Sequence, residues 1–402
     1  MNPVANPAEP LDLLLVGAGL ANGLIALHLA AHRPDVRFAL LEVGDAPGGN
    51  HTWSFHDSDL DAAGHALLVP CVAHRWPGYG VRFPQRTRRL AGGYASVTSE
   101  RFAAVLRERL GPRLHCSAPS AQVEATRVVL QDGRTLHARC VLDGRGARAS
   151  AHLALGFQSF VGQEVRTQAP HGLAEPVLMD ATVAQHGAYR FVYVLPLAAD
   201  RLLVEDTYYA DGDALDAAAL RARIGAYVQQ QGWAIAEVLR EERGVLPIVL
   251  AGDAQDFWAE SEGGAVPVGL AAGLFHPTTG YSLPDAARLA ARIGTLQDWS
   301  HAQVRAAVRA HALAAWDDRG FFRMLNRMLF LAAEPTERWR VMQRFYGLPA
   351  PLIERFYAAR LTWADRLRLV SGRPPVPLLA AARAASATGL RGAPATPRRH
   401  PA

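Results

Sequence analysis

The sequence predicts a protein of the α/β class, with a nucleotide-binding domain on parallel strands, an antiparallel β-sheet domain beside it, and a C-terminal helical region. Three observations predict this fold. A strand, a glycine turn and a helix follow one another near the N-terminus. Strand patterns without helical periodicity fill residues 157–208, and helical periodicity dominates from His301 onward. With 402 residues, half of them hydrophobic, the chain is long enough for two or three domains.

The first element is the stretch LDLLLVGAGLANG at residues 11–23. Residues 13–16 form an apolar run typical of a parallel strand that is covered on both faces. Gly17 and Gly19 allow a sharp turn that brings bare backbone against a pyrophosphate. Residues 20–31 then predict a helix whose N-terminal N–H groups and partial positive charge face that pyrophosphate.

A second apolar strand, residues 38–41, ends in Glu42. An acid about 20 residues after the glycines accepts ribose hydroxyls, and an acid rather than an arginine favours a ribose without a 2′-phosphate. The third glycine position of the motif holds Asn22, with Gly23 after it, so an ordinary βα turn is the alternative. The strand, the helix and the spaced acid together favour dinucleotide binding.

Further glycine-bearing turns follow at residues 46–55, 143–146 and 266–280. The first turn carries His51 and Trp53 back toward the nucleotide, with a surface loop as the alternative. Several separated turns around one sheet favour FAD over NAD, because FAD is larger and contacts the chain at remote places. The candidate cofactor-binding residues are Gly17, Gly19, Ala21, Asn22, Glu42, Gly49, Asn50, His51, Asp143, Gly144, Gly273, Thr278, Thr279 and Gly280.

The other elements complete a discontinuous domain plan. Residues 76–90 predict a hairpin, 100–110 a helix capped by Thr98 or Ser99, and 122–142 a hairpin with an Asp-Gly turn. Strands are expected at 157–165, 176–179, 189–197 and 201–208, and helices at 215–231, 235–242 and 283–293. The nucleotide-binding domain then comprises residues 1–70, 92–155 and 255–300, the sheet domain residues 71–91 and 156–254, the helical region residues 301–379, and a disordered tail residues 380–402.

Composition excludes several classes of function. The net charge is +5, but no basic stripe with interleaved aromatic residues indicates nucleic-acid binding. Three cysteines without paired spacing fit a reducing cytoplasm, and His51 and His56 lack the partners of a metal site. Residues 1–10 lack the features of a signal peptide, and no apolar run is long enough to span a bilayer. We therefore expect a cytoplasmic protein whose membrane contact, if any, is peripheral.

The main candidate for chemistry is the pair Glu205 and Asp206, which interrupts the apolar strand at residues 202–208. Neighbours on a strand face opposite sides, so one of the two acids points toward a buried face. Burial raises the pKa of a carboxyl group, which can then stay protonated near neutral pH and act as a general acid. The alternative is a structural hydrogen-bond network at a strand end.

Taken together, these motifs resemble the bacterial FAD-dependent lycopene β-cyclases from about residue 11 to about residue 379. The most specific stretches are AGLFHPTTGYS at residues 272–282 and FFRMLNRMLF at residues 321–330. Other matching stretches are residues 17–23, 48–55, 143–146, 160–164, 179–182, 189–193 and 205–207. The resemblance implies a Rossmann-type FAD-binding domain similar to that of aromatic hydroxylases and glutathione reductase. Gly269-Leu270 departs from the Gly-Asp of the hydroxylases, which weakens a hydroxylase interpretation.

The resemblance further implies an isomerase, an intramolecular lyase that closes β-ionone rings on lycopene in carotenoid biosynthesis, giving γ-carotene and then β-carotene. Glu205 matches the family's catalytic acid, and Asp206 would orient it or cap the strand. The family works beside reduced FAD, with NAD(P)H as the reductant and no net oxidation. Candidates for stabilising the carbocation are Trp53, Phe191, Tyr193 and Phe275, with Gln163 and Glu164 near the acid.

Two other functions remain open from the sequence. A flavin-dependent monooxygenase or prenyl reductase would share the nucleotide-binding fold and act on an isoprenoid substrate. A lipid carrier with a nucleotide fold would need no catalytic carboxyl group. Residues 321–345 mix large apolar residues with arginines, which predicts either a helix at the membrane interface or ordinary helix packing. The sequence leaves the oligomeric state and the choice between one and two rings open.

Overall fold

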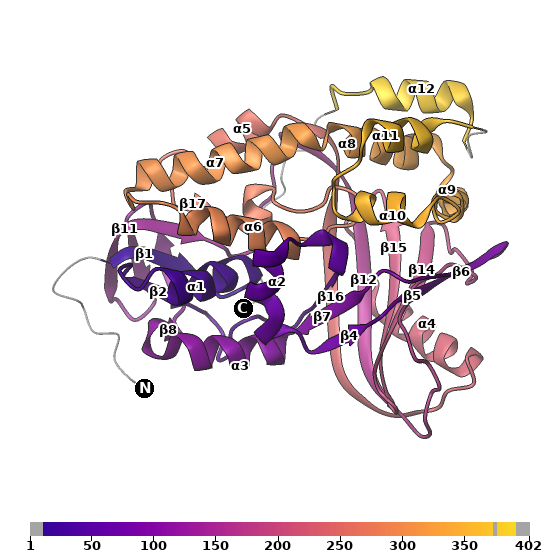
Figure 1. The fold of residues 1–402 in the computed structure, drawn as a ribbon, viewed down its shortest axis with the longest axis horizontal. Helices are drawn as coiled ribbons and strands as arrows, with labels where there is room; N and C mark the ends of the chain where they lie inside the picture. Colours follow the sequence, from indigo (N-terminus) through magenta and orange to yellow (C-terminus); the bar gives the residue numbers. More distant parts are fainter. Residues whose placement is uncertain (1–10, 373–375, 391–402) are drawn as a thin grey trace.

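The computed structural model describes residues 11–372 and 376–390 and confirms the predicted α/β class. Figure 1 shows three parts: a parallel sheet with its helices, a tall antiparallel sheet next to it, and a layer of C-terminal helices across the top of both. The nucleotide-binding part is assembled from segments far apart in the sequence. The site cavity described below lies where the three parts meet.

The parallel sheet is built around β1 (Leu11–Val16), which pairs with β2 (Phe38–Leu41) on one side and β11 (Thr135–Asp143) on the other. β1 and β2 are apolar because both faces of the sheet are covered: helices pack on one face, and apolar side chains of residues 118–138 pack on the other. These helices are α1 (Leu20–His32), α3 (Ser99–Leu110) and α6 (Leu283–Gly294). The other strands are β8 (Leu114–His115), β9 (Ser120–Val123), β10 (Arg127–Leu130) and β17 (Val266–Pro267).

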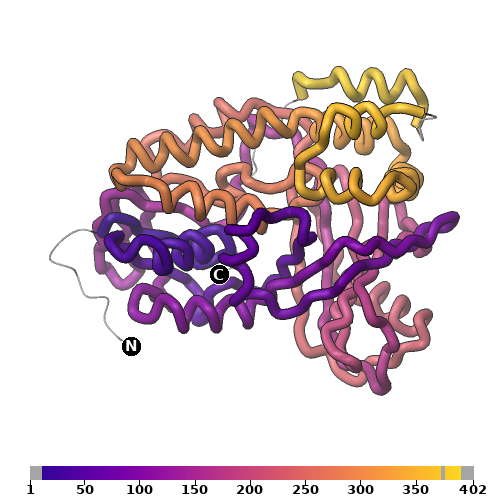
Figure 2. Tube along the Cα trace, viewed as in Figure 1, coloured from indigo at the N-terminus to yellow at the C-terminus, as the bar shows by residue number. Residues whose placement is uncertain are grey.

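The second sheet has the strand order β16-β12-β15-β14-β13-β5-β6. Its strands are β16 (Ile235–Gly252), β12 (Leu153–Thr167), β15 (Arg201–Ala210), β14 (Tyr189–Ala198), β13 (Val177–Asp180), β5 (Tyr79–Phe83) and β6 (Arg86–Leu90). Helix α4 (Ala217–Gln230) covers one face. The hairpin of β5 and β6 runs from the nucleotide-binding part to the far edge of this sheet, as the trace in Figure 2 shows.

The prediction of a helix at residues 235–242 is wrong, because β16 begins at Ile235. This strand pairs with β12 from Thr167↔Ile235 to Leu153↔Gly252. Long-range pairing with β12 therefore overrides a local pattern that is compatible with a helix. The consequence for the site is that residues 240–249, which pair with β12 without a register shift, alternate between the two faces of the sheet.

A small sheet links the two large ones. It consists of β3 (Thr52–His56), β7 (Tyr94–Thr98) and β4 (His74–Trp76), with β7 in the middle. Helix α2 (Ala62–Leu68) follows β3 in the chain, and α5 (Ala254–Ala259) follows β16. Short 3-10 turns connect elements at residues 57–59, 69–71, 111–113, 269–272 and 335–337.

The C-terminal helices correct two predictions. Residues 321–345 form no single helix, since a π-helical turn (Met328–Ala332) and Pro335 interrupt them, and Phe322 and Phe330 pack into the core. Part of the predicted disordered tail is helix α12, whose carbonyl groups accept hydrogen bonds from Arg327. Residues 391–402 of that tail lie outside the described part. The helices are α7 (His301–Asp318), α8 (Gly320–Arg327), α9 (Arg338–Phe345), α10 (Ala350–Tyr357), α11 (Trp363–Val370) and α12 (Leu378–Ser386).

Candidate functional site

The glycine turn after β1 forms a tight cradle. Gly17 has a φ of +85°, and a Cβ at this position would lie 3.1 Å from the carbonyl oxygen of Gly144. The side-chain amide of Asn22 donates to the carbonyl oxygens of Val16 at 2.9 Å and Gly17 at 3.0 Å. Only glycine fits this backbone and this closeness. The turn therefore brings β1, α1 and the end of β11 together, as the sequence predicts.

Glu42 lies beside this turn at the end of β2. Its Oε2 accepts a hydrogen bond from the Ala18 N–H at 2.8 Å, and its Oε1 accepts one from the Gly44 N–H at 3.0 Å. No side chain caps the N-terminus of α1. The buried Oδ1 of Asn22 has no hydrogen-bond partner among the described residues. A free helix N-terminus, an oriented acid and an unpaired buried oxygen fit a dinucleotide at this edge.

Two later segments extend the cradle toward the second sheet. The Gly48 N–H donates to the carbonyl oxygen of Ala18 at 2.9 Å, which anchors the loop before β3 to the glycine turn. Gly269 has a φ of +59°, and a Cβ there would lie 2.8 Å from the Cβ of Ala21. The segment before α6 therefore touches the first turn of α1. Its next residue, Leu270, lines the site cavity.

The site cavity lies between the antiparallel sheet, β3 and the segment before α6. It has a volume of about 200 Å³ and a mostly apolar and aromatic lining. Its lining residues from the sheet are Gln158, Phe160, Leu178, Met179, Phe191, Tyr193, Glu205, Tyr209, Glu242 and Leu246. Those from the other side are His51, Thr52, Trp53, Ser54, Leu270, Thr279, Gly280, Tyr281, Ser282, Leu283 and Tyr357.

Glu205 lies in this cavity wall, among aromatic rings. Its carboxyl group accepts a 2.5 Å hydrogen bond from the hydroxyl of Thr207, which is two residues further on the same strand. Burial raises the pKa of Glu205 to about 8, with the nearby carboxyl of Glu242 as the next cause, and the Thr207 hydrogen bond opposes the rise. Glu205 is therefore a carboxyl group that carries its proton at neutral pH and faces an apolar cavity.

The structure does not bring Asp206 to the cavity. Asp206 points to the opposite face of the sheet, where it is fully buried and forms an ion pair with Arg190 at 2.5 Å. Two further hydrogen bonds from Arg190 Nε, each 2.9 Å long, hold the same carboxylate. The ion pair of Asp206 thus stabilises the strand on the face opposite the cavity. Asp206 has this structural role in place of the expected one beside Glu205.

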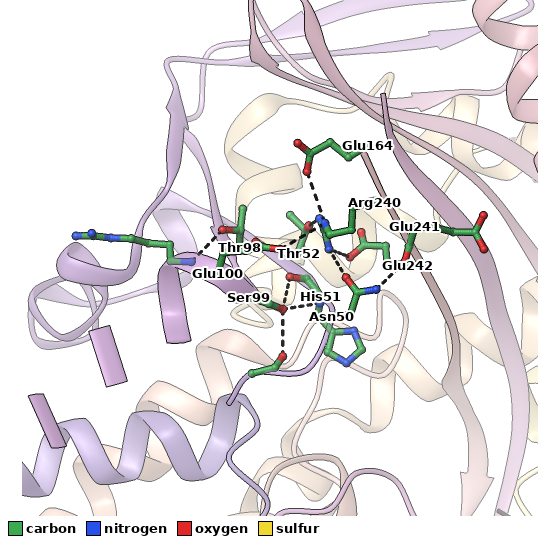
Figure 3. Close-up of polar contacts among 12 residues, drawn as sticks. Asn50, His51, Thr52, Thr98, Ser99, Glu100, Glu164, Arg240, Glu241 and Glu242 are labelled. Atoms are coloured by element: carbon green, nitrogen blue, oxygen red, sulfur yellow. Dashed lines mark hydrogen bonds and ion pairs between the residues drawn. The ribbon is translucent and has the colours of Figure 1, made fainter. Parts of the chain in front are cut away.

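Arg240 is the centre of a polar cluster at one end of the cavity (Figure 3). From β16 it donates to Asn50 Oδ1 at 2.8 Å, to Thr52 Oγ1 at 2.8 Å and to Glu242 Oε2 at 3.1 Å. Its Nε lies 3.5 Å from a carboxylate oxygen of Glu164. The cluster joins the loop before β3 to the antiparallel sheet, so it connects the nucleotide-binding side to the cavity side.

Sequence reasoning missed several of these residues. Glu242 and Arg240 were hidden by the helical interpretation of their segment, because side chains two positions apart, such as those at 240 and 242, share one face only in a strand. Tyr94 was also missed, although its hydroxyl lies 3.0 Å from that of Tyr193 and 2.9 Å from that of Tyr281. No local motif marks these tyrosines, because they come from three separate segments.

Other predicted residues lie away from the cavity. Phe275 and Gly273 line a separate small cavity, and Gln163 projects to the other face, where it donates to Glu241. Thr278 is buried just behind the cavity wall. Among the described residues, no group of three or more His, Cys, Asp or Glu could hold a metal ion. His56 is enclosed by Tyr79, Tyr94 and Tyr357, and burial lowers its pKa to about 3.

A second apolar cavity of about 120 Å³ adjoins the first. It is lined by side chains of α8, the π-helical turn, α9 and α11, among them Met328, Met342 and Val370. It reaches Thr278 and Phe356, whose chain neighbours Thr279 and Tyr357 line the site cavity. The pairs Thr278–Thr279 and Phe356–Tyr357 thus each contribute one residue to either cavity.

The fold and the site define the class: a Rossmann-type protein with the architecture of FAD-dependent oxidoreductases and monooxygenases. The flavin-dependent brominase Bmp2 (TM-score 0.62, 11% identity, 90% of this chain and 97% of that chain) and a geranylgeranyl bacteriochlorophyll reductase-like protein from Thermoplasma acidophilum (0.56, 12%, 91% and 97%) share this fold. Within that class, the family model described as "Lycopene cyclase protein" matches residues 12–383, and the chain belongs to the lycopene cyclase family.

Two curated relatives support the family membership over nearly the whole chain. A lycopene beta-cyclase of Pantoea ananas is 53% identical over 377 residues, which cover 94% of this chain and 98% of that protein. A lycopene beta-cyclase of Paracoccus sp. (strain N81106 / MBIC 01143) is 50% identical over 374 residues, covering 92% of this chain and 96% of that protein. The predicted resemblance is thereby confirmed.

Proposed function

We propose that this protein is a lycopene β-cyclase that closes the acyclic ends of lycopene into β-ionone rings without net oxidation. The observation that carries the proposal is Glu205, a protonated carboxyl group in the wall of a cavity lined by aromatic rings. The family membership and the relatives named lycopene beta-cyclase support the same substrate and reaction. The enzyme is then an isomerase.

In this mechanism Glu205 donates its proton to the terminal double bond of an acyclic end. A tertiary carbocation forms on the substrate, an internal double bond attacks it, and a six-membered ring closes. The ring then loses a proton, for which the ionised Glu205 is the base that the cavity offers. One proton enters and one leaves, so the product has the mass of the substrate.

Aromatic side chains around Glu205 stabilise the cation. Trp53, Phe191 and Tyr193, together with Phe160, line the cavity, and each ring face contributes about 1–2 kcal/mol to a desolvated cation. The apolar side chains of Leu178 and Leu246 help to exclude water, which would otherwise capture the carbocation. The cavity therefore favours ring closure over hydration.

FAD fits the cradle formed by Gly17, Asn22, Glu42 and Gly144. The fold and the free N-terminus of α1 support a bound dinucleotide, with Glu42 toward a ribose. When bound in its reduced form, with NAD(P)H as the reductant, the flavin would supply negative charge near the cation. The loop at residues 49–51 and the residues Thr279 and Gly280 extend from this cradle toward the cavity.

We further propose that the protein contacts the bilayer, where a polyene dissolves, through α11 and α12. Trp363 and Leu367 on α11 are 83% and 69% exposed, and Leu378 and Leu379 on α12 are 71% and 76% exposed. Both helices lie at the same outer end of the molecule (Figures 1 and 2). Arg366 and Arg368 add positive charge to α11, which suits anionic lipid headgroups.

This surface leads toward the site. The apolar cavity beneath α11 lies between the exposed residues and the Thr278–Thr279 wall, and it offers room for the part of a long polyene that does not react. Within the described residues, no helix is both long and apolar enough to cross a membrane. Peripheral contact is the mode that this arrangement supports.

The test is expression in a lycopene-making host, followed by absorption and mass analysis of the pigment. Rings on a product of unchanged mass are expected. A product that has gained oxygen or hydrogen would instead indicate a monooxygenase or a reductase, and unchanged lycopene together with bound lipid would indicate a carrier.

A further inference from the structure

Three neighbouring strands place two carboxyl groups over one glycine. Glu205 on β15 pairs with Gly162 on β12, and Gly162 pairs in turn with Glu242 on β16. Residues in register across a sheet project from the same face. A Cβ on Gly162 would lie 3.3 Å from Cγ of Glu242 and 3.5 Å from Cβ of Glu205. The two side chains therefore project from the same face on either side of the glycine, and both line the site cavity.

On the cavity face of the antiparallel sheet, carboxyl groups outnumber the arginines that contact them. Three carboxyl groups project from it, those of Glu164, Glu205 and Glu242. The cations in contact with them are Arg201, which binds Glu164, and Arg240, which contacts Glu164 and Glu242. Neither arginine forms an ion pair with Glu205, whose side chain accepts a hydrogen bond from the Thr207 hydroxyl. Ionisation of all three would leave a buried, uncompensated charge on Glu205.

We propose that Glu242 is a positioning residue whose carboxylate, kept ionised by Arg240, holds the catalytic proton on Glu205. A negative charge beside a carboxyl group opposes the loss of a second proton from the pair. Glu242 touches no reacting atom in this scheme. This inference rests on the proposed function only for its consequence for catalysis; the carboxyl pair itself is independent of the substrate.

Among the titratable groups around Glu205 on the cavity side, Glu242 is the one whose charge affects the protonation of Glu205. Four tyrosines have raised pKa values and stay neutral: Tyr209 on the sheet and Tyr357 on α10 are buried, and Tyr193 on the sheet and Tyr281 before α6 are half-buried. Burial and Arg240 lower the pKa of His51, which is also neutral. Asp206 is negative but lies behind the sheet, in its ion pair with Arg190.

The pKa directions agree with this assignment. After burial, Glu242 is the largest cause that raises the pKa of Glu205. Burial also raises the pKa of Glu242, but Arg240 and Thr52 oppose that rise. Because Arg240 also binds Asn50 in the loop before β3 and Thr52 at the start of β3, the ionisation of Glu242 depends on the position of that segment. Loop position and protonation of Glu205 are therefore linked.

The test compares Glu242→Gln with the wild type in the full chain. Infrared titration follows the protonated carboxyl band of Glu205, assigned by its loss in Glu205→Gln, without any substrate. We expect the midpoint to fall by about one pH unit in Glu242→Gln, because a negative charge on the same cavity wall has been removed. The apparent pKa of the alkaline limb in the pH profile of the cyclisation rate should fall by the same amount. Glu242→Asp should restore both the infrared midpoint and this pKa.

The matched control is Glu241→Gln, which removes the same charge from the adjacent residue. Glu241 projects from the other face and pairs with Arg221, so the midpoint should not move. An unchanged midpoint in Glu242→Gln, or an equal shift in Glu241→Gln, would overturn the proposal. A wild-type protein that closes no rings would refute the proposed function. The infrared titration would still decide whether Glu242 holds the proton on Glu205.

A second variant keeps the test available if Glu242→Gln does not fold. Gly162→Ala retains both carboxyl groups and Arg240 but places a methyl group between them, at the contacts given above. It should lower the Glu205 midpoint in the same direction, because Glu242, whose Cγ would lie 3.3 Å from the new methyl group, must shift away. No shift in a folded Gly162→Ala protein would count against the proposal.

Discussion

Glu205 and Asp206 are adjacent on β15 but face opposite sides of the antiparallel sheet. Glu205 lines the aromatic cavity and forms no ion pair with any residue that the structure describes, whereas Asp206 is buried behind the sheet in an ion pair with Arg190. Two neighbouring carboxyl groups thus have different surroundings. The carboxyl of Glu205 has a raised pKa because it is desolvated, and the carboxyl of Asp206 is bound by the guanidinium group of Arg190.

The first prediction concerns Glu205→Gln. The variant should retain its cofactor, because Glu205 lies apart from the glycine cradle, and should lose cyclisation by at least 10²–10⁴-fold, the usual contribution of a general acid. Pigment analysis in a lycopene-making host and flavin absorbance of the purified protein measure the two effects. Full activity of this variant would remove Glu205 from the mechanism.

The second prediction concerns Asp206→Asn. Loss of this charge leaves Arg190 buried and unpaired, which should reduce the free energy of unfolding by about 3 kcal/mol. Denaturant unfolding measures the change. The double variant Arg190→Met with Asp206→Leu should recover much of that loss, since no buried charge remains. A stability equal to that of the wild type in Asp206→Asn would contradict the role assigned to the ion pair.

The third prediction is the pH dependence. Glu205 reacts in its protonated form, which predominates below its raised pKa of about 8. Activity should therefore be full near pH 6–7 and fall about tenfold per pH unit well above pH 8. Measurement of kcat/KM across this range, with flavin content monitored at each pH, checks it. If kcat/KM instead began to fall near the ordinary pKa of a glutamate, the acid would be solvated.

The fourth prediction uses a pair of glycines. Gly17→Ala adds a Cβ 3.1 Å from the Gly144 carbonyl oxygen at a φ of +85°, so the cradle should distort and flavin content should fall. Gly133→Ala is the control: its φ is +87°, but a Cβ there has nothing within 4 Å. Both variants carry the same backbone strain, and only Gly17→Ala should lose flavin. Equal flavin content would place the dinucleotide elsewhere.

The fifth prediction tests the membrane surface. Trp363→Glu with Leu367→Glu should abolish co-flotation with liposomes that contain anionic lipid, while flavin content stays unchanged. Val238→Glu is the control, because Val238 is 48% exposed on β16, away from α11. Flotation of the wild type should weaken as salt rises, since Arg366 and Arg368 contribute through charge. Flotation that survives the double change would exclude this surface.

Local spacing determined the nucleotide-binding part from the sequence. The strands at residues 11–16 and 38–41, the turn at Gly17 and the acid at Glu42 are close in the chain, and each signal has a local physical cause. The same holds for Thr98 as the cap of α3 and for the hairpin of β10 and β11. Alternation along β15 also determined that only one of Glu205 and Asp206 could face a given side.

Tertiary structure decided the rest. Helix α4 covers one face of the antiparallel sheet, and this assigned the cavity to Glu205 and the buried ion pair to Asp206. Pairing with β12 made a strand of residues 235–252 and brought Glu242 over Gly162 to Glu205, from 37 residues away in the chain. A local pattern carries no information about which distant strand will pair with it, so the sequence alone could indicate the acid but not the neighbour that sets its charge.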